Sequence, residues 1–278
     1  MIKAVITSAG RGVRLLPMTK EMPKEMMPIF SKIYGNQRIV LPLLQLIFEQ
    51  VYSCNLRDYC FIVGRGKRSI EDHFTIDHHF RNTLSNKNRK IISNFYERLE
   101  NSHLVWINQD KPRGFGDAVR MAQRFVGQDN FIVHAGDVSI LSGRIHPILR
   151  LIKAGEDPSV SAVLLFRKVK DPERHGIPTL KKISKNLFLV EEVEEKPDKP
   201  KSNIGLMPLY FFTPRIFDAL KKIRLGKGKE YQLTDAIQKL IEHGEKIVAI
   251  PLSSVEKVLD VGTVDSYKCS QESSYRYA

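Results

Sequence analysis

The chain has few cysteines and no long apolar run. Its 278 residues include three cysteines, Cys54, Cys60 and Cys269, which are too few and too scattered for a disulfide framework or a zinc site. No apolar stretch approaches the roughly 20 residues that span a bilayer. Met1 leads directly into an apolar segment that lacks the layout of a signal peptide. We therefore expect inert thiols, no membrane partner and a cytoplasmic location.

Acidic residues are also under-represented relative to basic ones. There are 31 Asp and Glu against 44 Lys and Arg, a net charge of +13. Such an excess is compatible with a nucleic-acid partner or with substrates that carry several phosphates. The basic residues are dispersed, with local clusters at Arg65–Arg68, Lys87–Lys90 and Lys221–Lys229. We interpret most of them as solvated surface and expect no nucleic-acid partner.

Strand-like apolar runs alternate with helical patterns along the chain. Strands are predicted at Lys3–Ser8, Tyr59–Val63, His103–Ile107, Asn130–Val133, Val160–Phe166 and Leu206–Phe212, and helices at Val40–Cys54, Gly116–Phe125, Pro214–Ile223 and Leu233–His243. This alternation predicts an α/β fold, and the length suffices for one domain with a large core. The polar segment Ser85–Asn101 is interpreted as a helical excursion at the surface.

The segment from Ser8 to Ile29 combines glycines with basic residues directly after the first predicted strand. Gly10 and Gly12 let the backbone bend tightly, so that peptide N–H groups can point at phosphate oxygens. Arg14 can form a bidentate fork with a phosphate, and Lys24 can act as a mobile point charge. The segment lacks the ending of a P-loop and the third glycine of a dinucleotide fingerprint. Alone, it is equally compatible with a basic surface turn.

Two further segments follow predicted strands. The amide of Gln109 offers a donor and an acceptor, which suits the imide edge of a uracil base, and Gly114 leaves room for a flat ring. Asp137 follows the run Asn130–Val133 and is expected at the carboxyl edge of the sheet, where ligands gather and a carboxylate can hold Mg²⁺. The alternatives are a capped loop around Gln109 and a helix N-cap at Asp137.

Charged residues near the end of the chain complete the candidate set. Glu195 can accept hydrogen bonds from sugar hydroxyls, and Lys196 can neutralise a phosphate, although a charged run of this kind is usually a solvated turn. Asp260 follows an apolar stretch and precedes a helical pattern. Two carboxylates on one Mg²⁺ make chemical sense, but the spacing between Asp137 and Asp260 does not by itself bring them together.

These motifs resemble the sugar-phosphate nucleotidyltransferase family, whose signature runs Gly-x-Gly-Thr-Arg and later Pro-Lys. The matching residues are Gly10, Gly12, Arg14, Pro23 and Lys24, whereas Val13 stands where the family usually has Thr. The sequence of Thr19–Met26 is similar to that of the corresponding segment in the bacterial and archaeal UTP:glucose-1-phosphate uridylyltransferases. The resemblance extends from Ile2 to about Tyr267 and is weakest over Asp72–Ser102.

The resemblance implies a Rossmann-like α/β/α sandwich with a mixed, mainly parallel central sheet. It implies a single domain, with a nucleotide-binding half over about residues 1–140 and a sugar-binding and C-terminal half over about 141–278. The implied reaction is Mg²⁺-assisted transfer of a uridylyl group from UTP to glucose 1-phosphate, with release of pyrophosphate. A homo-oligomer is also expected.

Roles for single residues follow from the same resemblance. It implies nucleotide contacts from Ala9, Gly10, Gly12, Glu25, Gln109 and Gly114; catalytic roles for Arg14, Lys24 and Lys196; sugar-phosphate contacts from Gly176, Glu195, Lys196 and Asn203; and Mg²⁺ ligands at Asp137 and Asp260.

Two other functions stay open at this point. Because uracil and thymine differ by one methyl group, a thymidylyltransferase or an enzyme that accepts both UTP and dTTP is compatible with Gln109. The second is a catalytically silent nucleotide- or nucleic-acid-binding paralogue, which the charge of +13 favours. The paralogue predicts salt-dependent binding to nucleic acid and no release of pyrophosphate.

Overall fold

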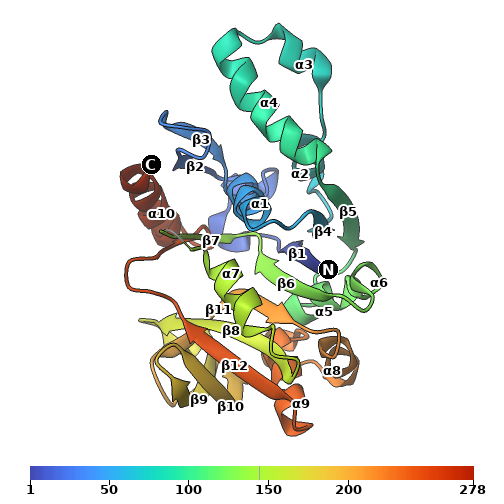
Figure 1. The fold of residues 1–278 in the computed structure, drawn as a ribbon, viewed down its shortest axis with the longest axis vertical. Helices are drawn as coiled ribbons and strands as arrows, with labels where there is room; N and C mark the ends of the chain where they lie inside the picture. The colour runs from blue at the N-terminus through green and yellow to red at the C-terminus, as the bar shows by residue number, and fades with distance from the viewer. Residues whose placement is uncertain (144) are drawn as a thin grey trace.

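A nine-stranded mixed sheet forms the centre of the protein (Figure 1) in the computed structural model, which describes residues 1–143 and 145–278. The strand order is β5-β4-β1-β6-β11-β8-β12-β10-β9. These strands span Ile2–Ser8 (β1), Asp58–Gly64 (β4), His103–Gln109 (β5), Asn130–Ala135 (β6), Val160–Lys168 (β8), Gly176–Ser184 (β9), Leu187–Glu195 (β10), Ile204–Phe212 (β11) and Lys246–Pro251 (β12).

The direction of the strands decides which of their ends meet. β1 runs parallel to β4 and β6, and β4 runs parallel to β5. β11 is antiparallel to both β6 and β8, so β6 and β8 share one direction. β12 is parallel to β8, and β10 is antiparallel to β12 and β9. Six strands, β1, β4, β5, β6, β8 and β12, therefore share one direction and end at the same edge, which confirms the expected mixed, mainly parallel sheet.

Helices cover both faces of this sheet, which confirms the predicted α/β/α sandwich. The first face is packed by α1 (Leu43–Ser53), α2 (Arg68–His73), α4 (Asn86–Glu100) and α7 (Pro147–Ala154). The second face is packed by α5 (Phe115–Met121), α6 (Gln123–Val126), α8 (Ile216–Lys222) and α9 (Leu233–Glu242). In α1 the apolar residues recur at helical spacing, and Leu43, Leu44, Ile47 and Val51 are fully buried as the sequence predicts.

Two small antiparallel sheets lie beside the central one. β2 (Pro28–Ser31) pairs with β3 (Ile39–Pro42), and β7 (Val138–Leu141) pairs with β13 (Lys257–Asp260). The C-terminal helix α10 (Val264–Tyr277) packs against β13 and β2. The β7–β13 pair joins two segments that are far apart in the chain. Only Gly136 and Asp137 separate β7 from the end of β6.

The segment Ser85–Asn101 is helical, as predicted. It forms α4, which with α3 (His78–Thr83) extends away from the rest of the molecule at the top of Figure 1. Only the C-terminal end of α4 is anchored, because Phe95, Tyr96 and Leu99 are buried. The remainder of the two helices is largely exposed.

Two predicted boundaries are wrong. Val40 does not begin a helix, because residues Ile39–Pro42 form β3; the β-branched pair Ile39 and Val40 favours a strand, and Pro42 keeps its preceding residue out of the helical region. The predicted helix Gly116–Phe125 is divided into α5 and α6 at Ala122. Across the described residues, no helix is long and apolar enough to cross a membrane.

Candidate active site

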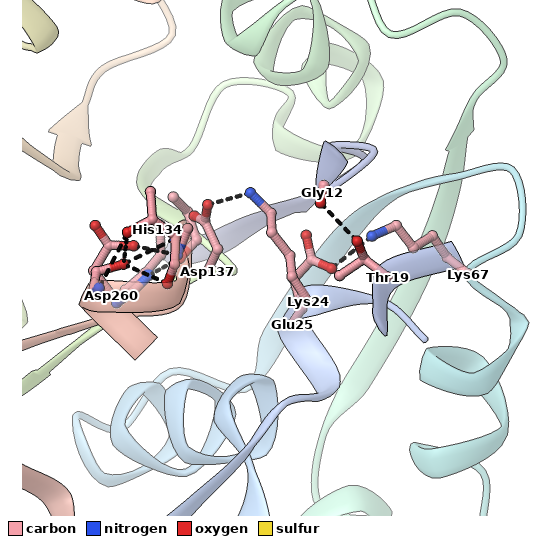
Figure 2. Close-up of polar contacts among 12 residues, drawn as sticks. Gly12, Thr19, Lys24, Glu25, Lys67, His134, Asp137 and Asp260 are labelled. Atoms are coloured by element: carbon pink, nitrogen blue, oxygen red, sulfur yellow. Dashed lines mark hydrogen bonds and ion pairs between the residues drawn. The ribbon is translucent and has the colours of Figure 1, made fainter. Parts of the chain in front are cut away.

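The loop after β1 is fixed by short turns at the carboxyl edge of the sheet. The loop contains three single 3₁₀ turns, Val13–Leu15 (η1), Met18–Lys20 (η2) and Lys24–Met26 (η3). Pro17 and Pro23 directly precede two of these turns and prevent a continuous helix. Gly12 has a φ of 66°, and its carbonyl accepts hydrogen bonds from the Thr19 hydroxyl at 2.7 Å and the Leu15 N–H at 2.9 Å (Figure 2). Thr19 thus braces the loop next to Val13, whose side chain is exposed.

Lys24 connects this loop to the predicted metal ligands. Its ammonium group forms an ion pair with Oδ2 of Asp137, as Figure 2 shows, and lies 3.6 Å from where a Cβ on Gly10 would be. Burial acts to lower the pKa of Lys24, but the carboxylates of Asp137 and Glu25 outweigh it, so the pKa is raised. Lys24 therefore carries a positive charge throughout the physiological range.

Asp137 and Asp260 come together although they are distant in sequence. Asp137 lies just after β6, and its carbonyl accepts a hydrogen bond from the Val261 N–H at 3.1 Å. Asp260 is the last residue of β13 and pairs with Val138 of β7. Burial raises the pKa of Asp260, the Gly262 N–H at 2.6 Å lowers it, and the charge of Asp137 raises it further. Two carboxylates therefore face one small region from adjacent strands.

Arg14 lies beside the same carboxylates. Its guanidinium nitrogen is 3.2 Å from where a Cβ on Gly262 would be, and Oδ1 of Asp260 is 2.9 Å from that point. Burial acts to raise the pKa of Asp137, but Lys24, and to a smaller extent Arg14, hold it below its usual value. The predicted catalytic cations Arg14 and Lys24 and the predicted metal ligands thus form one cluster.

Glu25 is turned away from this cluster into the protein. Only 1% of its surface is exposed, and Oε2 pairs with the Lys67 ammonium at 2.7 Å. Lys67 lies in the turn just before α2 and is itself buried. Burial raises the pKa of Glu25, and the charge of Lys67 partly opposes that rise. In this arrangement Glu25 holds the loop to α2, and a direct nucleotide contact stays a prediction.

Gln109 and Gly114 lie at the far end of the site from Asp260. Gln109 is the last residue of β5, which is longer than the predicted His103–Ile107. Its amide nitrogen donates to Oδ2 of Asp117 at 2.9 Å, and Asp117 also binds Arg120 at 2.7 Å. A carboxylate can only accept hydrogen bonds, so the amide nitrogen of Gln109 must be the group that faces Asp117. The amide oxygen of Gln109 is then left to accept a hydrogen bond from a ligand.

Gly114 is required for a different reason from the one that the sequence suggests. It has a φ of 112°, and a Cβ there would lie 2.7 Å from the Tyr231 carbonyl and 2.8 Å from Cβ of Glu230. The chain at Glu230 and Tyr231 fills the space on the side to which a Cβ would point, and a base contact at Gly114 stays a prediction. Gly114 lets the start of α5 pack against the segment before α9, where the Tyr231 N–H donates to the Arg113 carbonyl at 2.8 Å.

The predicted sugar-phosphate residues gather around the end of β10. Lys196 pairs with Oε1 of Glu195 at 3.0 Å, and the Thr234 hydroxyl donates to Oε2 of the same carboxylate at 2.6 Å. Gly176 pairs with Glu195 across β9 and β10, and a Cβ there would lie 3.1 Å from the Thr234 hydroxyl. The structure therefore brings Gly176, Glu195 and Lys196 together. Asn203 is exposed and contributes its carbonyl to the Val169 N–H at 2.8 Å.

Sequence reasoning missed two residues that hold these groups in place. Thr234, at the start of α9, orients Glu195; its place in the first turn of a predicted helix is the only signal for it. Lys67 neutralises Glu25. Because Lys67 belongs to none of the motifs, no pattern in the sequence predicted this pairing. Among residues 1–143 and 145–278, no three Asp, Glu, His or Cys side chains gather as a metal cluster.

Comparisons with known proteins show what the chain as a whole resembles. A family model described as nucleotidyl transferase matches residues 3–274. The UTP–glucose-1-phosphate uridylyltransferase of Bacillus subtilis is 34% identical over 245 residues, which cover 86% of this chain and 80% of that protein. The enzyme of the same name from Streptococcus pyogenes is 34% identical over 246 residues, 86% and 78% of the two chains. A solved structure of UDP-glucose pyrophosphorylase complexed with UDP-glucose is 25% identical, with a TM-score of 0.85 over all of both chains.

Proposed function

The chain belongs to the nucleotidyl transferase family, and we propose that it transfers the uridylyl group of UTP to glucose 1-phosphate, forming UDP-glucose and pyrophosphate. The observation that carries this proposal is the cluster of Arg14, Lys24, Asp137 and Asp260 at one sheet edge, next to the glycine turn. The relatives that carry the name of this activity match the chain over most of its length.

The nucleotide fits the half of the site that residues of about 1–140 build. The turn at Ala9, Gly10 and Gly12 is proposed to hold the triphosphate and border the base. The amide oxygen of Gln109 suits the N3–H of uracil, because that group is a donor. Cytosine has an acceptor at the same position and would face the oxygen of Gln109 without a proton between them. Gly114 fixes the turn that positions Gln109.

The cation is proposed to be Mg²⁺. Enzymes of this family generally use a divalent metal, and the two carboxylates of Asp137 and Asp260 provide the hard oxygen ligands that Mg²⁺ prefers. When bound, the ion neutralises charge on the reacting phosphates and aligns them. The ammonium group of Lys24 pairs with one oxygen of Asp137, and this contact directs the carboxylate into the site.

The sugar phosphate fits the half that residues of about 141–278 build. Glu195, held by Thr234, is proposed to accept hydrogen bonds from sugar hydroxyls, with Gly176 beneath the ring and Asn203 at its margin. Lys196 is proposed to bind the phosphate. Its φ of 46° is uncommon for a residue with a side chain and turns the lysine back toward Glu195.

The proposed chemistry is an in-line displacement at the α-phosphorus of UTP. An oxygen of the sugar phosphate forms the new P–O bond, and the bond between the α-phosphorus and the bridging oxygen of pyrophosphate breaks. Lys24 stays protonated because its pKa is raised, so it supplies charge rather than proton abstraction. With Arg14 it offsets the charge that develops on the departing pyrophosphate.

A matrix of substrates tests the proposal. Pyrophosphate release is measured for UTP, dTTP and CTP, each with the 1-phosphates of glucose, galactose and N-acetylglucosamine, in the presence of Mg²⁺. We expect the highest kcat/KM for UTP with glucose 1-phosphate and negligible release with CTP. Equal rates with dTTP would establish the dual-specificity alternative. No release with any pair, together with salt-dependent binding to nucleic acid, would establish the silent paralogue. A homo-oligomeric state and a cytoplasmic location stay predictions.

A further inference from the structure

Arg167 carries a charge for which the protein provides no partner. It lies on β8, one residue before the end of that strand, opposite Gly205 of β11. Leu165 and Val163 on the same strand are buried in the core on the α1 and α7 side, so the alternation of a strand places Arg167 toward that face. Within residues 1–143 and 145–278 its side chain forms no ion pair or hydrogen bond, and its Nε is buried without a partner.

The surroundings of Arg167 connect the two halves of the site. Burial lowers the pKa of Arg167, and the nearby carboxylate of Asp260 opposes that shift. His175 is a second neighbour, because its ring lies 3.0 Å from where a Cβ on Gly205, the strand partner of Arg167, would be. The pKa of His175 is lowered first by burial and then by the charge of Arg167. The carbonyl of His175 accepts the N–H of Lys196 at 3.0 Å. Arg167 therefore lies close to the predicted metal ligand Asp260 and, through His175, to the Glu195–Lys196 pair.

The Nε of Arg167 is buried without an acceptor, which is unfavourable because this N–H has lost water and gained nothing in return, while the side chain as a whole is half-buried. The planar fork of an arginine matches a phosphate or a carboxylate better than any neutral group does. Asp260 is not within ion-pair distance of Arg167, so the protein leaves this fork open to a ligand anion.

The position of the fork indicates which anion. In the strand order, the loop with Gly10, Arg14 and Lys24 follows β1 on one side of β6, whereas Lys196 follows β10 on the other side. Lys196 is the only cation so far assigned to the sugar phosphate, and its charge is already shared with Glu195 at 3.0 Å. A phosphate with two negative charges therefore needs a second cation in this half of the site.

We propose that Arg167 binds the phosphate of the sugar 1-phosphate substrate, between Asp260 and Lys196. This inference rests on the function proposed above, because it places the acceptor substrate of that reaction. The contact orients the attacking phosphate oxygen toward the α-phosphorus, and it selects substrates that carry a phosphate rather than a neutral sugar.

The test compares Arg167→Gln with Lys168→Gln, in which an exposed neighbour on the opposite face of β8 loses the same charge. Arg167→Gln is expected to lower kcat/KM for glucose 1-phosphate about 10- to 100-fold through a higher KM, the loss of one charged contact. The KM for UTP and the melting temperature should stay near the wild-type values. Lys168→Gln should leave both KM values within about twofold of the wild type.

A second variant and a second measurement separate the possible failures. Arg167→Lys keeps the charge without the fork, so it should regain part of the lost kcat/KM; it also serves if the glutamine variant does not fold. An unchanged KM for glucose 1-phosphate in folded Arg167→Gln overturns the inference.

If the wild type uses no sugar 1-phosphate, the proposed function fails, and Arg167 is tested by calorimetric titration of the UTP-saturated protein with inorganic phosphate. Equal phosphate affinity in the wild type and Arg167→Gln then overturns the inference, whereas weaker binding in that variant alone supports it.

Discussion

Replacing Lys67 by methionine will leave the carboxylate of Glu25 buried without its counter-charge. Both side chains are almost completely inaccessible, and 2.7 Å separates the ammonium from the carboxylate oxygen. Methionine has a similar length and fits an apolar setting, so the change removes the charge with little loss of volume. The variant therefore isolates the cost of an unpaired buried carboxylate in the catalytic loop.

The magnitude follows from distance and burial. Two unit charges 2.7 Å apart attract by about 6 kcal/mol at an effective dielectric constant of about 20. Part of this is offset because the ammonium no longer has to be desolvated, and removal of one partner of a buried pair typically costs about 3–5 kcal/mol. Urea denaturation at pH 7.5 should show a loss of that size in the free energy of unfolding of Lys67→Met.

The pH dependence gives an independent check. The pKa of Glu25 is already raised by burial, and loss of the Lys67 charge raises it further. A carboxyl group whose folded pKa is raised binds a proton more readily in the folded state than in the unfolded state. The difference in stability between the wild type and Lys67→Met should therefore shrink as the pH falls from 8 to 5.

An exposed ion pair of the same length serves as the control. Lys239 and Glu242 on α9 are also 2.7 Å apart, but both side chains are well exposed. Water screens that pair, so Lys239→Met should change stability far less than Lys67→Met does. The reasoning is refuted if Lys67→Met loses less than about 1 kcal/mol, the range of exposed pairs, or if its loss does not depend on pH.

Three further predictions concern the loop, a turn and a buried histidine. Lys24→Ala should lower kcat about 10²- to 10³-fold in a pyrophosphate-release assay with the fold intact, although the melting temperature should fall because Asp137 loses its counter-charge. Gly114→Ala should lose about 2 kcal/mol or more on urea denaturation, since a positive φ and a backbone clash combine, whereas Gly127→Ala, with a positive φ and open space, should lose about 1 kcal/mol. Burial lowers the pKa of His134 to about 4, so stability should fall by about 3 kcal/mol between pH 6.5 and 4, and His134→Gln should reduce that slope.

Each of these predictions has an outcome that contradicts it. Near-normal turnover of Lys24→Ala would remove the lysine from the catalytic step. Equal stability of the two alanine variants would show that the chain around Tyr231 yields to the new methyl group. A stability profile of His134→Gln that matches the wild type between pH 6.5 and 4 would show that other groups take up the protons.

Local patterns predicted the elements that bury one continuous apolar face. The run Ala4–Ile6 gave β1, and the spacing of Leu43, Ile47 and Val51 gave α1, because burial of those side chains is decided within the element itself. The start of α1 was placed too early, since the pairing of β3 with β2 is a contact between segments that a local window does not contain. The β7–β13 pair was missed for the same reason.

The same distinction between local and long-range contacts applies to the candidate site. The residues of the loop after β1, such as Gly10, Gly12 and Lys24, were predicted as one group because their spacing in the sequence is itself the motif. The pairing of Glu25 with Lys67 and of Glu195 with Thr234 depends on how separate helices dock on the sheet. Arg167 gave no signal in the sequence, because one arginine near the end of an apolar strand is indistinguishable from a solvated strand end.

The short β7–β13 pair also sets when the enzyme becomes competent during its own synthesis. Asp137 leaves the ribosome well before β13 does, and the N-terminal strands can assemble while the remainder is still being made. Until β13 pairs with β7, Asp260 has no place beside Asp137. A nascent chain that ends before β13 thus has the loop after β1 but lacks one of the two proposed metal ligands, and we expect no turnover of nucleotide until β13 has been made.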